Sequence, residues 1–381
     1  MSRVDELTAE LCPDGVRYRT VGRSVIAVAT GRGVPRSEYQ SGSAIPIIDQ
    51  GQGYVVGHTD DAALALPEDE YIVFGDHTRE VKWVEFSFAP GADGTKVLRA
   101  TDDLLPKFAY YALANLEIPS RGYNRHWTIL RDLMIPVPPL EVQREIVRVL
   151  DTFTELEAEL EAELEARRRQ YEHYRDGLFA RTTGRRLPMG EVGTFARGRR
   201  FTRADVVDDG IPSIHYGEIY THYGVSASAA ASQVRRELAG QLAFASPGDV
   251  VLAGVGETVD DVGKAVAWLG ETPVAIHDDT FRFRSDLDPR FVSYFTQTAA
   301  FHSQKNQYVA RAKVKRLSAA GLAKIEIPVP PLAEQKRIVT VLDSFDAIVN
   351  DISAGLPAEL AARRKQYEYY RDKLLTFREA S

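Results

Sequence analysis

The sequence predicts an α+β chain in which two mixed, mostly β globular domains alternate with two long helices that form an antiparallel coiled coil. Three observations support this prediction. A proline-rich hexapeptide occurs twice, a long helical pattern with a narrow apolar seam follows each copy, and the stretches before the two copies contain short β-type apolar runs. Two globules on duplicated helices imply a pseudo-twofold molecule.

The repeat begins with Ile-Pro-Val-Pro-Pro-Leu at residues 135–140, which returns at residues 327–332. Both copies continue with Gln, then Ile-Val, then Leu-Asp at the same spacing. A second matched block, Arg-Arg-x-Gln-Tyr-Glu-x-Tyr-Arg-Asp, lies at residues 167–176 and 363–372. Proline restricts the preceding residue to extended backbone, so each hexapeptide is expected to end a strand and start a helix.

The helix after the first hexapeptide is expected to reach about Phe179. Its apolar residues recur every three or four positions and draw one narrow seam, while glutamates dominate the other faces, as in a coiled coil. About forty residues would give a rod of roughly 60 Å. Two unrelated surface helices are the alternative. The residues expected at the helix–helix and partner interface are Ile146, Leu150, Phe153, Leu160, Tyr171, Tyr174, Ile338, Leu342, Phe345, Ile352, Tyr367 and Tyr370.

The second helical repeat is four residues longer than the first, because the hexapeptides are offset by 192 residues and the terminal blocks by 196. The excess falls near Gly355-Leu356-Pro357. Proline inside a helix removes a hydrogen bond and clashes with the preceding turn. We therefore expect a kink or short loop near Gly355, and the exact spacing set by the rods depends on this segment.

The predicted order is globule, rod, globule, rod, with segments 1–137, 138–184, 185–329 and 330–381. Apolar runs at 45–48, 71–74 and 83–86 predict strands in the first globule. A helix is expected over 102–116. In the second globule, 211–214 corresponds to 45–48, and a helix is expected from Pro289 to about Gln304.

Composition narrows the possible functions. The chain has 381 residues, a net charge of −7 and a single cysteine, which fits a reducing cytosol and excludes a disulfide framework. No apolar run is long enough to cross a membrane, and the first residues do not resemble a signal peptide. The negative charge is unevenly distributed, since residues 138–184 hold eleven acidic and seven basic groups. Any nucleic-acid site must therefore be a local basic surface.

No catalytic constellation is recognisable. Gly254-Val255-Gly256 lacks the spacing of a dinucleotide loop and is interpreted as a turn after a strand. No phosphate-binding Gly-Lys-Ser/Thr motif occurs. The sequences His277-Asp278-Asp279 and His58-Thr59-Asp60-Asp61 could suggest metal ligands, but neither has a second ligand cluster at a convincing spacing, so no metal site is predicted. Cys12 has no partner set that would make it a nucleophile.

Basic residues interleaved with aromatic and amide side chains form four clusters, one pair before the rods and one pair before the Ile-Pro strands. Arginine and lysine neutralise phosphates, while arginine, asparagine and glutamine match base edges. The candidate DNA-binding residues are Arg32, Arg36, Tyr39, Arg121, Tyr123, Asn124, Arg125, His126, Arg197, Arg199, Arg200, Arg203, His215, Tyr216, Lys305, Asn306, Gln307, Tyr308, Arg311, Lys313, Lys315 and Arg316.

Over essentially its whole length the chain resembles the specificity subunit of type I restriction–modification systems. The marks are the two Ile-Pro-x-Pro-Pro-Leu segments, the two Arg-Arg-x-Gln-Tyr helix ends, and the stretches 214–220 and 74–77. The resemblance implies that each globule reads one half of a split DNA target. It also implies that the helices set the spacing and dock two methyltransferase subunits, which restriction subunits join. Catalysis, S-adenosylmethionine, ATP and Mg would belong to those partners, and this chain would be a non-catalytic cytoplasmic protein.

Two other classes stay open at this point. A coiled-coil scaffold that binds proteins would explain the rods but not the paired basic–aromatic clusters. A DNA-modifying enzyme with fused recognition domains would need a methylase or nuclease motif, and the sequence offers none.

Overall fold

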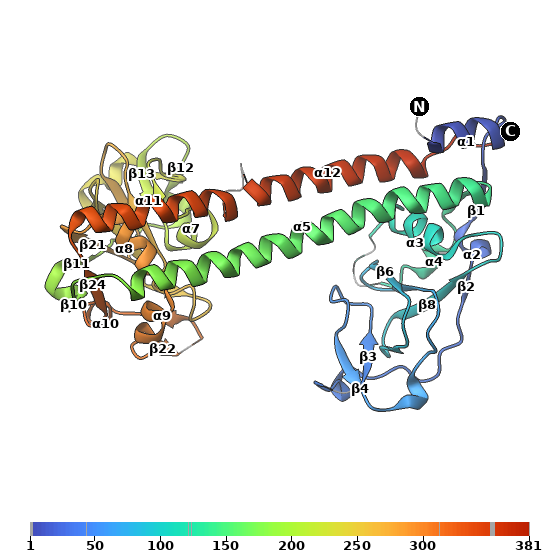
Figure 1. Cartoon of the computed structure of the whole chain (residues 1–381), viewed down its shortest axis with the longest axis horizontal. Coiled ribbons are helices and arrows are strands. Elements are labelled where there is room, and N and C mark those ends of the chain that lie inside the picture. The colour runs from blue at the N-terminus through green and yellow to red at the C-terminus, as the bar shows by residue number, and fades with distance from the viewer. Residues whose placement is uncertain are drawn as a thin grey trace. The chain divides into compact units, whose positions relative to one another are not determined.

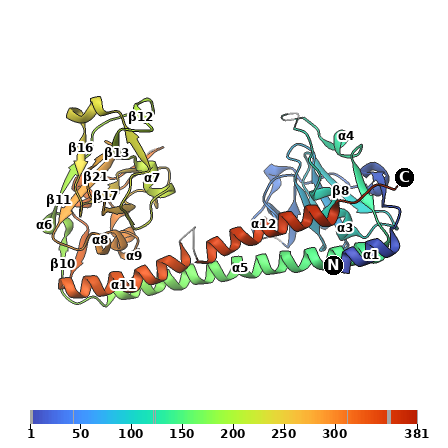
Figure 2. The same ribbon diagram turned by 90° about the horizontal axis from the view of Figure 1, so that it is seen from above.

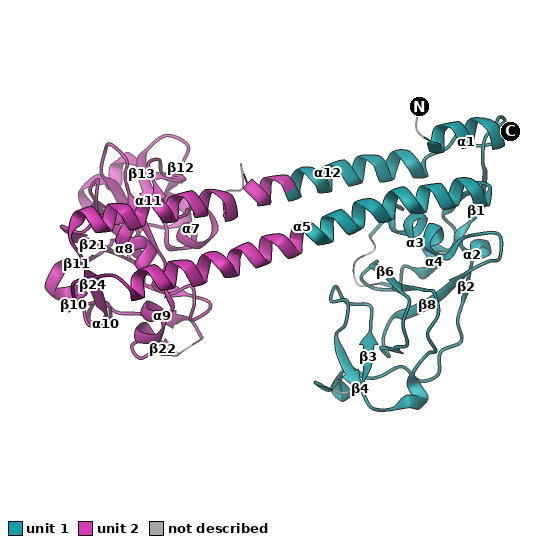
Figure 3. Ribbon diagram, in the orientation of Figure 1, with its two compact units in different colours: residues 1–159, 360–381 teal, residues 160–359 magenta. Residues whose placement is uncertain are grey.

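The computed structural model describes residues 3–42, 44–120, 122, 124–311, 313–350 and 355–380, without the side chain of Arg311. The chain forms two compact units (Figure 3). The first comprises residues 1–159 and 360–381, and the second comprises residues 160–359. Each unit therefore combines one globule with helical segments that are remote in sequence. The four-segment division at residues 138, 185 and 330 stays a prediction.

The first unit holds a four-stranded sheet in the order β2-β8-β5-β6, a three-stranded sheet in the order β4-β3-β7, and the antiparallel pair β1-β9. Its strands are β1 Arg17–Thr20, β2 Val25–Ala27, β3 Ile45–Ile48, β4 Gly57–Thr59, β5 Tyr71–Gly75, β6 Val81–Val84, β7 Ala89–Pro90, β8 Thr95–Ala100 and β9 Met134–Val137. Its helices are α1 Arg3–Leu11, α2 Val21–Ser24, α3 Pro106–Ala114, α4 Trp127–Leu130, the first part of α5 Leu140–Ala180 and most of α12 Gly355–Leu375, with 3-10 turns at Arg36–Glu38 and Ala62–Leu64.

The second unit repeats this topology with additions. Its sheets have the orders β11-β21-β17-β19-β14, β12-β15-β13-β20-β16, β18-β23-β22 and β10-β24. Its strands are β10 Arg185–Pro188, β11 Gly193–Arg197, β12 Val206–Val207, β13 Ile211–Ile214, β14 Ser226–Ala227, β15 Ser232–Val234, β16 Ala243–Ala245, β17 Val250–Ala253, β18 Val255–Gly256, β19 Ala265–Trp268, β20 Val274–Ile276, β21 Thr280–Ser285, β22 Ala310–Arg311, β23 Lys315–Arg316 and β24 Glu326–Val329. Its helices are α6 Met189–Val192, α7 Tyr216–Thr221, α8 Pro289–Phe295, α9 Ala299–Lys305, α10 Ala319–Leu322, α11 Leu332–Val349 and the last part of α5, with 3-10 turns at Arg203–Asp205 and Arg236–Gln241 (Figure 1).

The two globules share one arrangement of paired strands, of which the sequence indicated only a part. In the first unit Ile48 of β3 pairs in parallel with Pro90 of β7, and in the second Ile214 of β13 pairs in parallel with Ile276 of β20. The predicted correspondence between 45–48 and 211–214 is therefore confirmed by register. Because the registers match, the residues that follow these pairs occupy equivalent places in the two units.

Each hexapeptide ends a strand and starts a helix, as predicted. Residues 135–137 lie in β9, which pairs with β1, and residues 327–329 lie in β24, which pairs with β10. Helices α5 and α11 then begin at Leu140 and Leu332. The repeated glutamine ties each helix to its globule: Gln143 accepts a hydrogen bond from the backbone N–H of Leu105 at 2.8 Å, and Gln335 accepts one from that of Asp288 at 2.8 Å.

Antiparallel helix contacts occur within each unit. In the first, Phe153 of α5 stacks on Tyr370 of α12 with ring centroids 5.5 Å apart, and Glu157 accepts a hydrogen bond from Arg364 at 2.6 Å. In the second, α5 and α11 lie side by side (Figures 1 and 2). Tyr171 and Tyr174 of α5 contact α11. Tyr174 meets Phe345 with centroids 5.1 Å apart. Later residues of one helix thus meet earlier residues of the other.

Four residues of the predicted helix–helix seam pack against the globules instead. Ile146 and Leu150 are fully buried in the core cluster that contains Phe108 of α3, and Ile338 and Leu342 are buried in the cluster that contains Phe291 of α8. These four residues fasten the helices to the globules, so the expectation of a purely helix–helix seam is corrected. Leu160 is half-buried, Tyr367 lies 6.3 Å from Phe153 between ring centroids, and Ile352 falls outside the described residues.

The predicted interruption of the second rod is confirmed. Helix α11 ends at Val349 and α12 begins at Gly355, which has a φ of +71°. A Cβ on Gly355 would lie 2.5 Å from the carbonyl oxygen of Ile348, so only glycine fits against the end of α11. Pro357 then lies in the first turn of α12, where its missing N–H costs little.

Two predicted helix boundaries were wrong. The helix expected over 102–116 is α3, which starts later because Asp103 is held by Arg19 through a hydrogen bond of 2.7 Å. The helix expected over 289–304 is two helices, α8 and α9, separated where Thr298 caps the N-terminus of α9 by accepting a hydrogen bond from the N–H of Phe301. A polar cap thus marks the break between α8 and α9, whereas no side chain caps the start of α3.

Candidate nucleic-acid interface

A polar cavity of about 430 Å³ opens on the second unit and gathers two of the predicted clusters. Its walls come from the loop after β11, the start of α7, the turn between β20 and β21, and β23. The lining residues are Arg197, Arg200, Phe201, Thr202, Arg203, His215, Tyr216, His277, Asp278, Asp279 and Arg316. With four arginines and two aspartates, the cavity is cationic overall.

The strand frame positions the charged residues. Arg197 ends β11, in register with Phe281 of β21, and its Nε donates to the carbonyl oxygen of Asp278 at 2.6 Å. Arg316 lies on β23, where its Nη1 is 3.3 Å from Oδ1 of Asp279. The arginine side chains are both 57% exposed, so their remaining N–H groups face solvent.

Aromatic rings pack against one another in the same cavity as these arginines and aspartates. The ring centroids of His215 and Tyr216 are 4.3 Å apart, and those of His215 and His277 are 4.4 Å apart. His215 caps α7 by accepting a hydrogen bond from the N–H of Gly217 at 3.2 Å. Burial and the neighbouring His277 lower the pKa of His215, which keeps the imidazole neutral at physiological pH.

The hydrogen bonds of His277 argue against a metal site. In the part of the chain that the structure describes, only His277, Asp278 and Asp279 bring three possible ligand atoms together. Nδ1 of His277 accepts from the N–H of Asp279 at 3.1 Å, so Nε2 carries the proton and faces the carbonyl oxygen of Phe201 at 3.1 Å. Both ring nitrogens are therefore engaged by the backbone, and both carboxylates lie within 3.9 Å of an arginine.

Two predicted DNA contacts are corrected because their side chains are in the interior. Lys305 is fully buried, and its ammonium donates to the carbonyl oxygens of Asp260 and Val262 at 3.1 and 2.7 Å. His126 is also fully buried, and its Nδ1 lies 3.0 Å from the carbonyl oxygen of Asp76. Side chains that are fully buried and face backbone carbonyls do not reach the protein surface, so they cannot contact DNA.

Other candidates lie on the surface of the second unit. Arg199, Asn306, Gln307 and Lys313 are exposed, and Lys315 is half-buried on β23. Tyr308 is half-buried against the core, with its ring under the ammonium of Lys324 at 5.8 Å.

The first unit does not gather its candidates in the same way. Arg32 donates to Glu38 at 2.5 Å, and Tyr39 is anchored by a hydrogen bond from its hydroxyl to Asp49 at 3.3 Å. Burial and Asp49 raise the pKa of Tyr39 to about 12. The remaining described candidates, Arg36, Asn124 and Arg125, are exposed. Arg121 and Tyr123 lie outside the described residues.

Sequence reasoning missed Phe201, Thr202, Asp278 and Asp279, which complete the cavity of the second unit. The sequence around His277 was considered only as a set of metal ligands. The turn that carries it lies far along the chain from Arg197, and only the pairing of β11 with β21 brings the two together.

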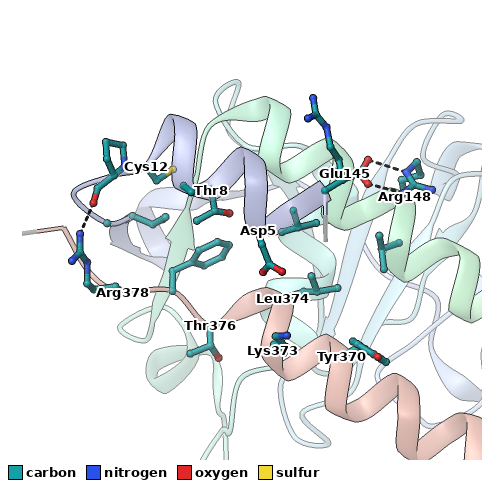
Figure 4. A pocket seen from close by; sticks show the side chains of 18 of the residues that line it. Asp5, Thr8, Cys12, Glu145, Arg148, Tyr370, Lys373, Leu374, Thr376 and Arg378 are labelled. Atoms are coloured by element: carbon teal, nitrogen blue, oxygen red, sulfur yellow. Dashed lines mark hydrogen bonds and ion pairs between the residues drawn. The ribbon is translucent and has the colours of Figure 1, made fainter. Parts of the chain in front are cut away.

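A larger groove of about 790 Å³ in the first unit has a different chemistry (Figure 4). It lies between α1, the first part of α5 and the residues at the end of α12, and includes Cys12, Glu145 and Tyr370. Burial raises the pKa of the Cys12 thiol, so little nucleophilic thiolate forms at neutral pH.

Among the described helices, none combines the length and apolar character needed to cross a bilayer.

Comparison with known proteins gives consistent results. The sequence profile of the type I restriction modification DNA specificity domain matches residues 23–166 and 188–362. The chain is 28% identical over 365 residues to the type I restriction enzyme EcoR124I/EcoR124II specificity subunit of Escherichia coli, with 90% of each chain covered. It is also 28% identical over 341 residues to a putative type I restriction enzyme specificity subunit of Haemophilus influenzae, with 86% of each covered.

Two solved structures share the fold. The S subunit of a type I restriction-modification system from M. genitalium superposes with a TM-score of 0.53 at 15% identity, covering 95% of this chain and 96% of that one. A chain from a study of complex assembly and conformational transition of a type I R-M system gives 0.59 at 17% identity, covering 96% and 98%. These likenesses support the predicted α+β architecture of two globular domains with helical connections.

Proposed function

The chain belongs to the family of type I restriction modification DNA specificity domains, and we propose that each of its two units reads one half of a bipartite DNA target. The two units share one arrangement of strands, but the loops at the ends of these strands differ. This supports the proposal that each unit is a separate DNA-reading domain. The cavity of the second unit carries the proposal further than any other feature. It combines exposed guanidinium groups for phosphates and base edges with aromatic rings and carboxylates.

The helices would set the gap between the two half-targets and dock two methyltransferase subunits. Their contacts within each unit leave many charged side chains in solvent; Glu163 of α5, for example, is 49% exposed in its side chain. Such faces suit a polar interface with partner proteins. Restriction subunits would join the assembly through those methyltransferases.

Catalysis would belong to the partners. The family to which the chain belongs is defined by DNA specificity domains. We therefore propose that this chain is non-catalytic, and that S-adenosylmethionine, ATP and Mg bind to the partner subunits.

Binding-site selection tests the proposal directly. The chain, purified with its methyltransferase partner, is incubated with duplexes that carry a randomised region, and the retained duplexes are sequenced. We expect enrichment of two short fixed sequences at a constant distance. A coiled-coil scaffold without DNA specificity would give a methyltransferase complex that retains all duplexes equally.

A further inference from the structure

The cavity of the second unit contains two carboxylates that a site for phosphate alone would not need. Asp279 lies between two arginines: its Oδ1 is 3.3 Å from Arg316 and 3.9 Å from Arg197. Asp278 is 3.9 Å from Arg197 and 3.3 Å from Nε2 of His277. A carboxylate repels phosphate and withdraws cationic charge from it, so these residues weaken the cavity as a phosphate clamp.

The same carboxylates have a use in reading bases. The major-groove edge of cytosine offers an amino donor, which Asp or Glu accepts, while guanine offers N7 and O6 acceptors, which arginine contacts in bidentate fashion. In a G·C pair the cytosine amino group and guanine O6 are adjacent, within hydrogen-bond distance. Arg316 and Asp279 are likewise adjacent, and both are on the cavity surface.

The number of available donors and acceptors also fits. A guanidinium has five N–H donors, so Arg316 can give two to guanine and retain its contact with Asp279. A carboxylate has two oxygens with about four acceptor positions, and the arginines approach only Oδ1 of Asp279. Oδ2 lies 4.0 Å from Nδ1 of His277, which carries no proton because it accepts from the N–H of Asp279, so Oδ2 keeps acceptor positions for an amino group.

We propose that Arg316 and Asp279 together read one G·C base pair in the half-target recognised by the second unit. Arg316 contacts guanine, and Asp279 accepts from the amino group of cytosine. This inference rests on the proposed function. The equivalent position of the first unit differs: Gly91, the counterpart of His277, leaves room for Tyr39, whose hydroxyl oxygen would lie 2.8 Å from a Cβ there. The first unit therefore reads its half-target with other groups.

Three variants of the complete complex with its methyltransferase partner test the proposal: Arg316→Lys, Arg316→Gln and Asp279→Asn. Methylation of a duplex library in which each target position is varied is measured by sequencing. We expect each variant to lose roughly 5- to 150-fold of the discrimination at one G·C position of one half-target. Arg316→Lys keeps the charge for a phosphate but lacks the planar fork, so it separates base reading from charge neutralisation.

The ion pair between Arg236 and Asp209, 2.8 Å long and outside the cavity, provides matched controls in the same unit. Arg236→Gln and Asp209→Asn are expected to keep the wild-type preference, and melting temperatures verify folding of all variants.

Several results would overturn the inference while leaving the proposed function intact. One is a wild-type half-target for the second unit without a G·C pair. Another is a loss in the cavity variants that is equal for all sequences, or wild-type behaviour of Arg316→Lys, since both would assign Arg316 to a phosphate. Unchanged discrimination in Asp279→Asn would likewise remove that residue from base reading. A wild-type complex that methylates no preferred sequence would instead contradict the proposed function itself.

Discussion

The junction between helix and globule is built from the same kinds of interaction in both units, whereas the loops beyond the shared strands differ. In the first unit the Tyr111 hydroxyl donates to Asp151 at 2.6 Å, and Lys107 lies 3.1 Å from the same carboxylate. In the second, Tyr294 donates to Asp343 at 2.7 Å, and Arg290 lies 2.5 Å from it. These residues belong to the repeated Leu-Asp motif and to the helices that begin with Pro106 and Pro289.

The loops show the opposite behaviour. After the matched parallel pair of strands, the first unit continues with Gly91, while the second continues with His277, Asp278 and Asp279. The first arrangement accommodates Tyr39, and the second forms a charged cavity. The shared strands hold the units to their helices, while residues at the ends of the strands are free to vary in chemistry. A recognition protein needs this separation of roles.

The largest effect is expected when the matched core leucines are truncated. Leu150→Ala and Leu342→Ala each remove a fully buried side chain at the junction and should each lower the free energy of unfolding by about 2–5 kcal/mol. Urea denaturation followed by circular dichroism measures the loss. Ile348→Ala, at a position 50% exposed in the same helix as Leu342, is the control and should cost far less. A large loss in only one of the two leucine variants would break the equivalence of the junctions.

Removing arginines from the loops of the two units should change the salt dependence of DNA binding by different amounts. Replacing Arg199, Arg200 and Arg203 by alanine removes exposed cations at or beside the cavity of the second unit. The slope of log affinity against log salt should fall by roughly 0.9 for each DNA phosphate that the variant no longer neutralises. Titration of the complex with duplex DNA at several salt concentrations measures the slope.

Arg32→Ala in the first unit is compared with Arg200→Ala alone in the second. Its effect on the salt slope should be smaller, because Glu38 already neutralises Arg32. Equal slopes for the wild type and the triple variant would exclude these arginines from the DNA interface.

A smaller and symmetric effect is expected at the tyrosine hydroxyls. Tyr111→Phe and Tyr294→Phe each remove one hydrogen bond to the repeated aspartate, with an expected cost of about 1.5–3 kcal/mol because the acceptor is a carboxylate. Thermal denaturation of the two single variants and the double variant measures it. Because the sites lie in separate units, the two losses should add. A strong departure from additivity would mean that the junctions do not act independently.

A pH dependence of stability is also expected in the second unit. Burial, followed by the charge of Lys305, lowers the pKa of His302 to about 4. On unfolding, His302 regains its ordinary pKa near 6.5, so the unfolded state binds a proton at a pH where the folded state does not. Stability from this residue is present above pH 6.5 and is lost as the pH falls toward 4. His302→Gln should flatten this part of the stability curve in urea titrations, and an unchanged curve would show that His302 does not contribute.

Much of the fold could be predicted because the repeat is long and the strands are short and regular. The hexapeptides located two strands and two helix starts, since proline acts on local backbone. The role of Leu150 and Leu342 was harder to foresee, because a 3–4 spacing does not reveal whether a helix or a globule covers the seam.

The site was only partly predictable for a similar reason. Arg197 and Arg316 were identified from local clusters, but their partner Asp279 was not. Lys305 and His126 show the converse error. A basic or aromatic neighbourhood in sequence does not disclose that a side chain points inward and satisfies backbone carbonyls.

The central claim is that the two units read separate halves of one target, and mapping methylated sites across a genome tests it most directly. Cells expressing the complex with the wild-type chain are compared with cells carrying Arg316→Gln and Asp279→Asn, which alter only the cavity of the second unit. The account predicts one bipartite methylated sequence in the wild type. In the variant, one half should become degenerate while the other half and the gap stay unchanged. A continuous wild-type target, or a variant in which both halves change together, would contradict it.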